Sequence, residues 1–439
     1  MKNQTFILIL ILLFAGCTTL PNQQKNWAEK TLSELTLREK IAQMMIYRMN
    51  MRFKDIPEKK WDEITHLIET DGIGGIHLWY GDVSSSLVIM NDMQAMSKIP
   101  IIFDADMEYG LHQRFPSGTD LPPFMAIAAT DNPENAYLAG KIVAEEARAA
   151  GIQWNLSPVV DVNNNSENPI INTRSFGEHP DLVTNFAIPY MRGLQENGVL
   201  ATAKHFPGHG DTETDSHSSL AMIPSDSGRL WSVEIPPFQA MADAGVDAIM
   251  VAHVHAPDYQ PESDSPASID PFWIQSILKQ KIGFDGVVIT DAMGMGGVTK
   301  NYSDAYALIE TINAGSDVII QNYNLKGSID VVEKAAHQGL IPINRINESA
   351  LKMLQIKMKA GLNQSKFITS DYARQTIGKK ENRTVANQMA TEAITCVKNE
   401  LNLIPLVNNE KNPLFVIDLF DSRNNHSHSL VSKDIKKLG

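Results

Sequence analysis

The chain has 439 residues, of which 43% are apolar and 20% are charged, and its formal net charge is −13. This composition is typical of a globular protein, and the length suits one large domain or two medium ones. No run of Lys and Arg resembles a nucleic-acid footprint, and the acidic balance predicts weak affinity for polyanions. We therefore expect no nucleic-acid partner.

The N-terminus has the pattern of a targeting segment. An unbroken apolar run from Phe6 to Phe14 follows Lys2, and Ala-Gly leads to Cys17. The run is too short to span a bilayer but fits the apolar part of a signal peptide. The ending LFAGC resembles a bacterial lipobox, although Phe14 stands where an aliphatic residue is preferred. We expect residues 1–17 to direct export and Cys17 to carry a lipid that anchors the protein to a membrane of the bacterial cell envelope. The alternative is a plain cleaved signal with an incidental cysteine.

The sequence contains a second cysteine, Cys396. If Cys17 is acylated, no intrachain disulfide can form. Cys396 lies in the apolar stretch AITCVK, which favours a buried, unreactive thiol over a nucleophile.

Eight short apolar runs between residues 40 and 360 are candidate strands. Several are apolar at successive positions and rich in Ile, Val and Ala, as expected for a parallel sheet buried on both faces. The runs are IAQMMIY (41–47), GGIHLW (74–79), PIIFDAD (100–106), IQWNLSPVV (152–160), LATAKHF (200–206), DAIMVAHV (247–254), GVVITDAM (286–293) and DVIIQN (317–322).

Amphipathic segments that predict helices lie between these runs, and several end at a glycine that would stop a helix. The glycines are Gly151, Gly198, Gly245, Gly283 and Gly315. Eight strand and helix units in about 320 residues predict an α/β fold of the (β/α)8 TIM-type barrel class. An open doubly wound sheet is the alternative, but no glycine-rich phosphate loop begins a helix.

The pattern changes after residue 362. We assign residues 25–362 to the barrel and residues 363–400 to a polar, helical connector. Residues 401–439 begin with a new apolar strand pattern but are too few for an independent core. They predict the incomplete start of a second α/β domain; the alternative is a C-terminal strap packed on the barrel.

Polar residues follow several of the predicted strands. Asp106, His205, His253 and Asp291 lie at or near strand C-terminal ends. In a barrel these ends form one mouth, where active sites are found. Packing alone gives no reason for charged residues to gather there.

The stretch KHFPGHGDTETDSH, residues 204–217, is dense in ionisable groups. His205 and His209 have a spacing that would suit a zinc-binding helix, but the intervening proline and glycines exclude a helix, and no Cys pair or second His cluster completes a metal site. In extended chain, residues two apart lie on the same side and roughly 6.6 Å apart, so Asp215 can meet His217. A carboxylate on one imidazole nitrogen leaves the other free for proton transfer near neutral pH. A solvated loop is the alternative.

Asp291 is the candidate counterpart of this pair. It ends an apolar strand, where an isolated charge is costly unless it faces a polar cavity. The alternative is that Asp291 caps the next helix.

These residues resemble the family 3 glycoside hydrolases of the bacterial β-N-acetylglucosaminidase type. The resemblance spans about residues 35–360, and KHFPGHGDTETDSH carries it. Flanking motifs agree: QWNLSPVVDVNNN (153–165), NTRSFGEHP (172–180) and VVITDAMGM (287–295). The resemblance implies a retaining, two-step hydrolysis in which Asp291 is the nucleophile, His217 the general acid/base and Asp215 its partner. A histidine here departs from the usual pair of carboxylates.

The resemblance also implies contacts to a non-reducing sugar. Asp106 matches an aspartate that holds sugar hydroxyls, and it opens DMEYGLHQR, which resembles the family's Asp-x-Glu-x-Gly segment. An arginine common in that segment is replaced here by Leu111. The other matching sugar-binding residues are Arg114, Arg174, Lys204 and His205. Each has a structural alternative, such as a surface ion pair for Arg174 or a buried salt bridge for Lys204. His253 is expected to line the mouth without chemistry, and His209 and Asp211 to shape the loop.

The sequence thus predicts an exported exo-β-N-acetylglucosaminidase that removes terminal β-linked N-acetylglucosamine from cell-wall fragments or other glycans, with no metal or organic cofactor. A β-glucosidase, a broader β-hexosaminidase and a phosphorolytic variant are alternatives within the family. A non-catalytic sugar-binding lipoprotein is the alternative of another class, although a binder needs neither Asp291 nor the Asp215/His217 pair.

Overall fold

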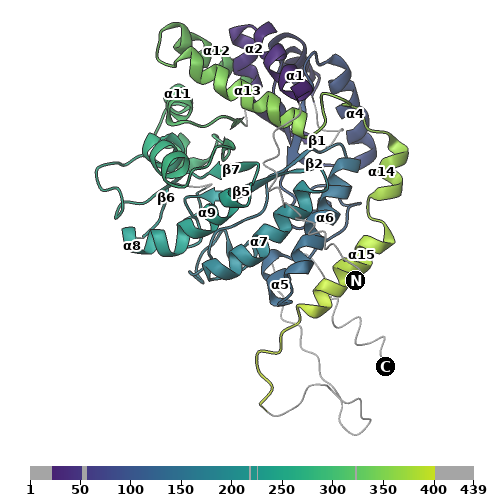
Figure 1. The fold of residues 1–439 in the computed structure, drawn as a ribbon. Helices are drawn as coiled ribbons and strands as arrows, with labels where there is room; N and C mark the ends of the chain where they lie inside the picture. Colours follow the sequence, from purple (N-terminus) through teal and green to yellow (C-terminus); the bar gives the residue numbers. More distant parts are fainter. Residues whose placement is uncertain (1–21, 52–56, 217–218, 225, 322–323, 401–439) are drawn as a thin grey trace, which may run out of the picture. The chain divides into compact units, whose positions relative to one another are not determined.

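The structure is a computed structural model that describes residues 22–51, 57–216, 219–224, 226–321 and 324–400 (Figure 1). The chain divides into two compact units, residues 1–394 and residues 395–439. The first unit holds every helix and strand described below. The predicted lipidation site Cys17 and the predicted second domain, residues 401–439, lie outside the described residues.

Eight parallel strands form one sheet, in the order β10-β1-β2-β3-β4-β5-β7-β9. Their bounds are Met45–Met51 (β1), Gly75–Gly81 (β2), Ile102–Ala105 (β3), Trp154–Asn155 (β4), Leu200–Phe206 (β5), Ala248–Val251 (β7), Val287–Thr290 (β9) and Ile319–Gln321 (β10). A parallel bridge between Ile289 and Val318 joins the two ends of the sheet. The predicted (β/α)8 barrel is therefore confirmed. A separate small sheet pairs Ala221–Met222 (β6) with Val254–His255 (β8).

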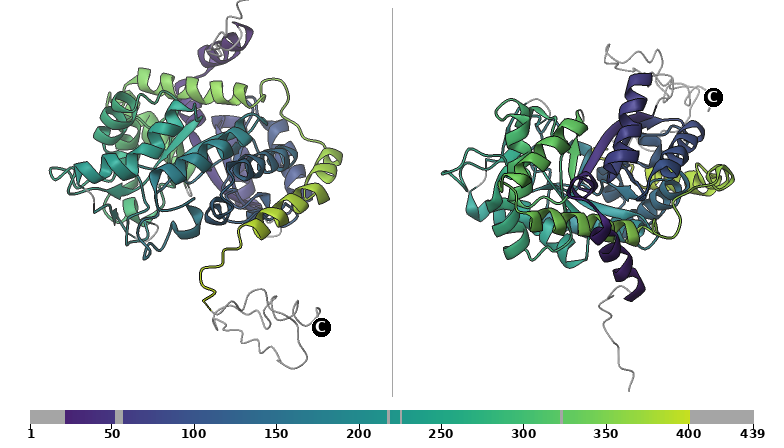
Figure 2. Two further views of the ribbon diagram at one scale, coloured as in Figure 1. Left: turned by 60° about the horizontal axis from the view of Figure 1, so that its bottom comes forward. Right: turned by 90° about the horizontal axis from the view of Figure 1, so that it is seen from above.

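Helices surround the strands on the outside (Figures 1 and 2). The α-helices are α1 Asn22–Glu34, α2 Leu37–Gln43, α3 Glu58–His66, α4 Val83–Met96, α5 Phe124–Ala129, α6 Pro133–Ala149, α7 Pro180–Gln195, α8 Ser227–Arg229, α9 Ile235–Asp243, α10 Gly296–Thr299, α11 Asp304–Ala314, α12 Leu325–His337, α13 Ile343–Lys359, α14 Ser370–Thr376 and α15 Lys380–Glu392. Three π-helical segments are η2 Leu67–Asp71, η5 Leu230–Glu234 and η7 Phe272–Lys281. All five predicted stop glycines have positive φ, from 80° at Gly151 to 118° at Gly315. This conformation suits glycine because it has no Cβ.

Alternate apolar residues along each strand belong to two different cores, one inside the barrel and one between the strands and the helices. Ile46 and Ile102 belong to a cluster inside the barrel, whereas the adjacent Met45 and Phe103 belong to the larger cluster between strands and helices. This arrangement explains why the strand sequences are apolar at successive positions. Met353 and other residues of α13 join the inner cluster and close one end of the barrel.

Two local expectations from the sequence are wrong. Residues 41–43, predicted to begin the first strand, end helix α2, whose Thr36 and Glu39 form a capping box. The capping box offers this segment a favourable helix start, so the strand begins only at Met45. Cys396 is exposed rather than buried. It follows α15 in a segment where the described residues are mostly exposed, so an apolar local sequence did not indicate burial.

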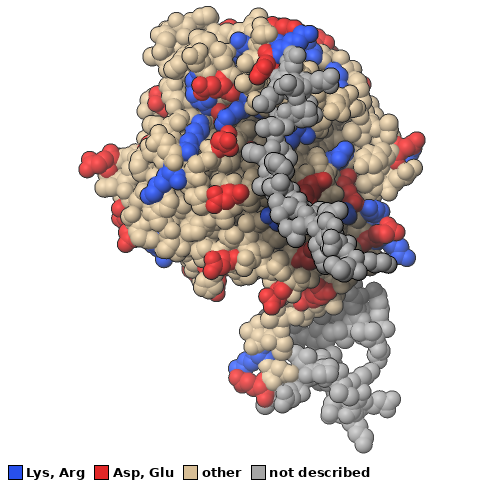
Figure 3. Space-filling model, in the orientation of Figure 1, with Lys and Arg blue, Asp and Glu red and all other residues tan. Residues whose placement is uncertain are grey.

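Charged side chains of both signs are interspersed on the face shown in Figure 3. None of the helices in the described part of the chain is long and apolar enough to span a membrane.

Candidate active site

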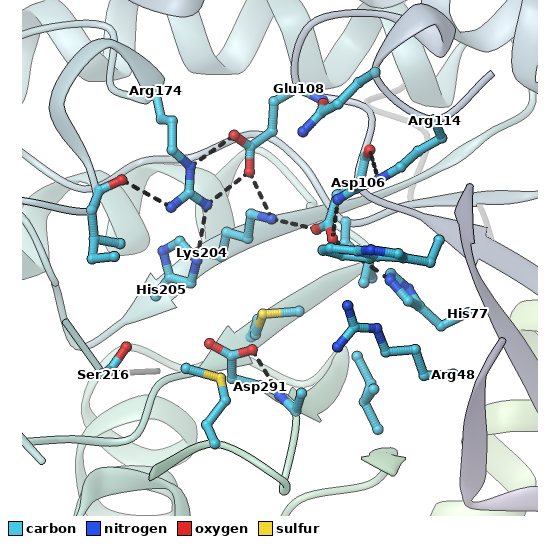
Figure 4. Close-up of a pocket in the computed structure, with 18 of the residues that line it drawn as sticks. Arg48, His77, Asp106, Glu108, Arg114, Arg174, Lys204, His205, Ser216 and Asp291 are labelled. Carbon is cyan, nitrogen blue, oxygen red and sulfur yellow. Dashed lines mark hydrogen bonds and ion pairs between the residues drawn. The ribbon is translucent and has the colours of Figure 1, made fainter. Parts of the chain in front are cut away.

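Successive side chains of a strand point alternately into the barrel and outward. At the C-terminal ends of the strands, this alternation directs polar side chains into the barrel. On β3, Ile102 belongs to the inner cluster, so Asp104 and Asp106 share its face of the chain. The same period places Lys204 of β5 on the side of Leu200, and Asp291 on the side of Ile289. The polar residues at this end line a cavity of about 400 Å³ (Figure 4).

Six predicted site residues line this one cavity. They come from loops and strands around the barrel and are Asp106, Arg114, Arg174, Lys204, His205 and Asp291. Ser216 lines the same cavity. The adjacent His217, the predicted acid/base, lies outside the described residues. Asp215 is partly buried, and its backbone carbonyl accepts a hydrogen bond from the Ser219 N–H at 3.1 Å.

Asp106 is held by two cations. Lys204 Nζ lies 2.7 Å from Asp106 Oδ1, and Arg114 Nη2 lies 2.9 Å from Asp106 Oδ2. Burial alone would raise the pKa of Asp106, but these two cations hold it well below its usual value. Asp106 is therefore an ionised acceptor at the cavity wall.

Glu108 is a site residue that the sequence analysis did not assign. Arg174 donates to both of its carboxylate oxygens at 2.9 Å, and Lys204 Nζ lies 2.9 Å from Oε1. Against the effect of burial, Arg174 and Lys204 lower the pKa of Glu108 to about 2. Its position two residues after Asp106, in the segment DMEYG, was the signal that could have identified it.

Asp161 is a second residue that sequence reasoning missed. Its carboxylate lies 2.7 Å from Nδ1 of His205 and accepts the backbone N–H groups of His205 and His209. It lies in the quoted motif SPVVDVNNN, where it is the only ionisable residue. Because Asp161 holds Nδ1 of His205, Nε2 is directed toward Arg174, at 3.4 Å, and toward the cavity.

His209 fastens the loop that carries the predicted acid/base. Its two ring nitrogens lie 2.6 Å from Thr212 Oγ1 and 2.8 Å from Ser216 Oγ. Burial and the neighbouring His205 lower the pKa of His209 to about 4, so the ring is neutral at pH 7. The Ser216 carbonyl also accepts the Gly297 N–H at 3.2 Å. These contacts confirm that His209 shapes the loop, and they fix it immediately before position 217.

Asp291 follows β9 and lines the cavity with a half-buried side chain. Burial tends to raise the pKa of Asp291, but His205, His253 and the Ala292 N–H at 2.7 Å outweigh it, so the pKa is lowered. Asp291 does not cap the next helix, because α10 begins five residues later with Met295 as its N-cap. The arrangement provides an ionised carboxylate facing a polar cavity, which is what a carboxylate nucleophile requires.

His253 differs from its predicted place. It is fully buried, and its ring nitrogens lie 2.7 Å from Ser268 Oγ and 3.1 Å from the Ala292 carbonyl. It therefore supports the segment that begins with Asp291 and does not line the mouth. Within the described ranges, no group of three His, Cys, Asp or Glu residues is arranged to hold a metal ion.

The cavity wall beside Asp106 and Arg114 contains three residues that the sequence analysis did not assign: Arg48, His77 and Trp79. Trp79 lies against the guanidinium carbons of Arg48 and Arg114, at 3.8 and 3.9 Å from its ring centroid. His77 also lines the cavity. Flat aromatic surface beside hydrogen-bonding groups is typical of a site that receives a saccharide ring.

The glycosyl hydrolase family 3 N-terminal domain matches residues 36–356. The chain belongs to glycoside hydrolase family 3. A β-N-acetylglucosaminidase/β-glucosidase of Cellulomonas fimi is 27% identical to it over 402 residues, which cover 90% of this chain and 70% of the relative.

Solved family 3 structures share the fold. A β-N-acetylglucosaminidase from Paenibacillus sp. FPU-7 is 30% identical with a TM-score of 0.75, over 83% of this chain and 70% of that one. The β-glucoside phosphorylase BglX is 27% identical with a TM-score of 0.82, over 88% of this chain and 70% of that one. The chain thus spans 70% of the length of each of these family 3 proteins.

Proposed function

We propose that this family 3 protein is a retaining exo-β-N-acetylglucosaminidase that removes terminal β-linked N-acetylglucosamine from glycans, with peptidoglycan fragments as the natural class. The observation that carries this proposal is that one cavity is lined by Asp291, by the five predicted sugar-binding residues and by Ser216. The β-N-acetylglucosaminidase names among the similar proteins support the same sugar.

The site residues divide into a binding set and a reacting set. A buried sugar hydroxyl needs one acceptor and one or more donors. Asp106 is the acceptor, and Lys204, Arg114, Arg174 and His205 supply donors around it. Together they hold the terminal sugar with its anomeric carbon toward Asp291.

In the proposed first step, a carboxylate oxygen of Asp291 attacks the anomeric carbon as the bond to the leaving oxygen breaks. His217 donates its proton to that oxygen, and the product is a glycosyl-enzyme ester with a neutral imidazole. In the second step, His217 takes a proton from water, which attacks the same carbon and releases Asp291. Asp215 orients the ring and favours its protonated form.

Phosphorolysis is a second candidate, favoured by the likeness to a β-glucoside phosphorylase at a TM-score of 0.82. In that reaction phosphate replaces water in the second step and the product is a sugar 1-phosphate. A neutral imidazole repels incoming phosphate less than a carboxylate would.

The test uses nitrophenyl β-N-acetylglucosaminide and nitrophenyl β-glucoside, each with and without phosphate. We expect the acetamido substrate to be preferred and free N-acetylglucosamine to be the product; a sugar 1-phosphate would establish phosphorolysis instead. Asp291→Asn should lose activity by roughly 1,000-fold or more. The matched control is Asp285→Asn, an exposed aspartate before the same strand, which should keep full activity. No turnover of either glycoside would favour the sugar-binding alternative.

We also propose that Cys17 is lipidated and holds the enzyme at a membrane of the bacterial cell envelope. The lipobox-like ending LFAGC supports this proposal. Labelled fatty acid should enter the wild-type protein in bacterial cells and not the Cys17→Ala variant. Equal membrane retention of both proteins would contradict the anchor.

A further inference from the structure

His77 and Asp104 form a buried pair on the inner face of two adjacent strands. They are direct partners in the parallel register of β2 and β3. Their chain neighbours Ile76, Leu78 and Phe103 belong to the outer core, so both side chains face the barrel interior. His77 is 3% exposed and Asp104 is 0% exposed.

The imidazole lies between two carboxylates at different depths. Nδ1 of His77 lies 2.6 Å from Asp104 Oδ1, below the cavity, and Nε2 lies 3.7 Å from Asp106 Oδ2, at the cavity wall. The first contact is a short hydrogen bond, whereas the second is too long for one. Figure 4 shows His77 beside Asp106 with its ring toward the cavity, which it lines.

Asp104 depends on His77. Among the described residues, no hydrogen-bond partner reaches its second oxygen, Oδ2. Burial raises the pKa of Asp104, and the adjacent imidazole acts in the opposite direction. Burying a carboxylate with so few hydrogen-bond partners costs folding free energy, so packing alone does not explain the pair. A binding role of the ring in the cavity would explain it.

The nitrogen of His77 that faces the cavity lies beside an acceptor. Asp104 occupies the Nδ1 side of the ring and Asp106 lies on the Nε2 side, so a donor at Nε2 is the role that fits the cavity side. The charged groups around His77 are Asp104 of β3, Asp106 and Arg114 of the segment after β3, Arg48 of β1 and Lys204 of β5.

We propose that His77 is a substrate-binding residue whose Nε2–H donates to the sugar hydroxyl that Asp106 accepts, and that Asp104 is the residue that positions it. The inference rests on the proposed glycosidase function and adds a specificity element to it. Asp106 takes the proton of the hydroxyl, and His77 satisfies a lone pair of the same oxygen. The cavity would thereby select sugars that carry a free hydroxyl at that position.

A panel of deoxy substrates tests this proposal. The nitrophenyl β-N-acetylglucosaminide and its 3-, 4- and 6-deoxy analogues are assayed with wild type, His77→Phe and His77→Gln. We expect His77→Phe to lower kcat/KM on the parent by about 10- to 100-fold, as for a lost hydrogen bond that leaves a buried polar group unsatisfied. One of the three analogues lacks the hydroxyl that His77 is proposed to contact, and on that analogue His77→Phe should lower kcat/KM by less than about threefold. Gln, whose amide can donate from a similar place, should recover part of the activity.

The split between KM and kcat tests the part played by Asp104. Asp104→Asn keeps the side-chain size but removes the carboxylate that holds the Nδ1 side of His77, so KM should rise by about 10-fold while kcat changes by less than about threefold. His337→Phe replaces an exposed histidine of α12 and is the control that should change nothing. If His77→Phe does not fold, His77→Gln and Asp104→Asn carry the test.

Either of two kinetic results would overturn the proposal. Equal loss on the parent and on all three deoxy analogues, with no recovery by Gln, would show that the pair only packs the barrel. An unchanged KM in Asp104→Asn would show that Asp104 does not position the ring. If wild type cleaves no glycoside, the proposed function fails, and calorimetric binding of N-acetylglucosamine to wild type and His77→Phe then decides on His77. Binding that is absent in wild type, or equal in these two proteins, would also overturn the proposal.

Discussion

Asp106 and Glu108 share the ammonium group of Lys204, and each has an arginine of its own. Such a network costs desolvation energy, because the ions leave water, and each ion is tolerable only while its partners remain. Arg174 and Lys204 therefore keep fixed positions at the cavity wall because Glu108, which lines the same cavity, pairs with both. We expect Glu108 to affect substrate binding through these two donors.

Replacing Glu108 by Gln should damage both stability and activity. Arg174 and Lys204 would remain buried with one neutral partner, which we expect to cost ~3 kcal/mol of unfolding free energy at neutral pH. Misplacement of the two donors should lower kcat/KM by about 100-fold. Denaturant unfolding and steady-state kinetics measure the two effects. Glu178→Gln, a change at a side chain that is 73% exposed, is the control.

The same variant has a predicted pH dependence. The pKa of Glu108 is about 2 in the fold and 4.5 in the reference state, so its ionised form stabilises the protein. That contribution is complete above about pH 4.5 and is lost as the pH falls toward about 2. The stability gap between wild type and Glu108→Gln should therefore narrow on acidification. A gap that stays constant over this range would contradict the ion-pair role.

The sequence located six residues that line the cavity but neither their supports nor the wall that contains Arg48, His77 and Trp79. Asp106, Lys204 and Asp291 were predictable because charges at strand ends are unusual and because motifs resemble the family. Glu108 and Asp161 lie within the family-like motifs, but their importance lies in contacts to residues 44 or more positions away, which spacing along the sequence does not show. His77 looked like part of an apolar strand, and only the register with Asp104 reveals it.

At the scale of elements, all eight predicted strands exist, although most are shorter than their apolar runs. IQWNLSPVV was predicted as one strand, yet β4 contains only Trp154 and Asn155. The rest of the run still follows β5: the Thr202 N–H donates to the Ser157 carbonyl at 2.9 Å, and the Val160 N–H donates to the Lys204 carbonyl at 2.8 Å. Pro158 has no N–H to donate, and beyond it the pairing is reduced to an isolated bridge between Val159 and Lys204. An apolar run predicts that a segment is buried, but it does not predict how much of the segment pairs as a regular strand.

A buried glutamate is one of the contacts that fasten the segment after residue 362 to the barrel. Glu146 of α6 accepts from Thr119, through its N–H at 2.8 Å and its hydroxyl at 2.5 Å. It also accepts from the Gly378 N–H at 3.0 Å and the Asn382 side chain at 3.2 Å. The contacts join α6 to the start of α15.

Glu146→Gln should loosen this attachment. The amide adds donors where only donors are present, so we expect a loss of about 2 kcal/mol. Hydrogen exchange should rise in residues 378–392, while kcat/KM stays within about twofold of wild type because the cavity is elsewhere. Glu381→Gln, at an exposed position of α15, is the control. Unchanged exchange in α15 would show that the helix is held by other contacts.

At the scale of the whole molecule, the barrel brings residues from distant parts of the sequence to one mouth. Arg48, Asp106, Lys204 and Asp291 are separated by up to 243 positions but line one cavity. The closed parallel sheet makes this possible, because every strand ends at the same rim. The family could be recognised from one stretch of 14 residues. The identity of the sugar, and whether water or phosphate accepts it, could not be recognised, because both depend on the shape of this rim.

The central claim is that Asp291 forms a covalent bond to the sugar. The most direct measurement is mass spectrometry of the peptide containing Asp291 after reaction with a fluorinated N-acetylglucosaminyl fluoride, whose fluorine slows release of the intermediate. We expect a sugar adduct on Asp291 in wild type and none in Asp291→Asn. An adduct on another residue, or turnover with inverted anomeric configuration and no adduct, would contradict the proposed mechanism.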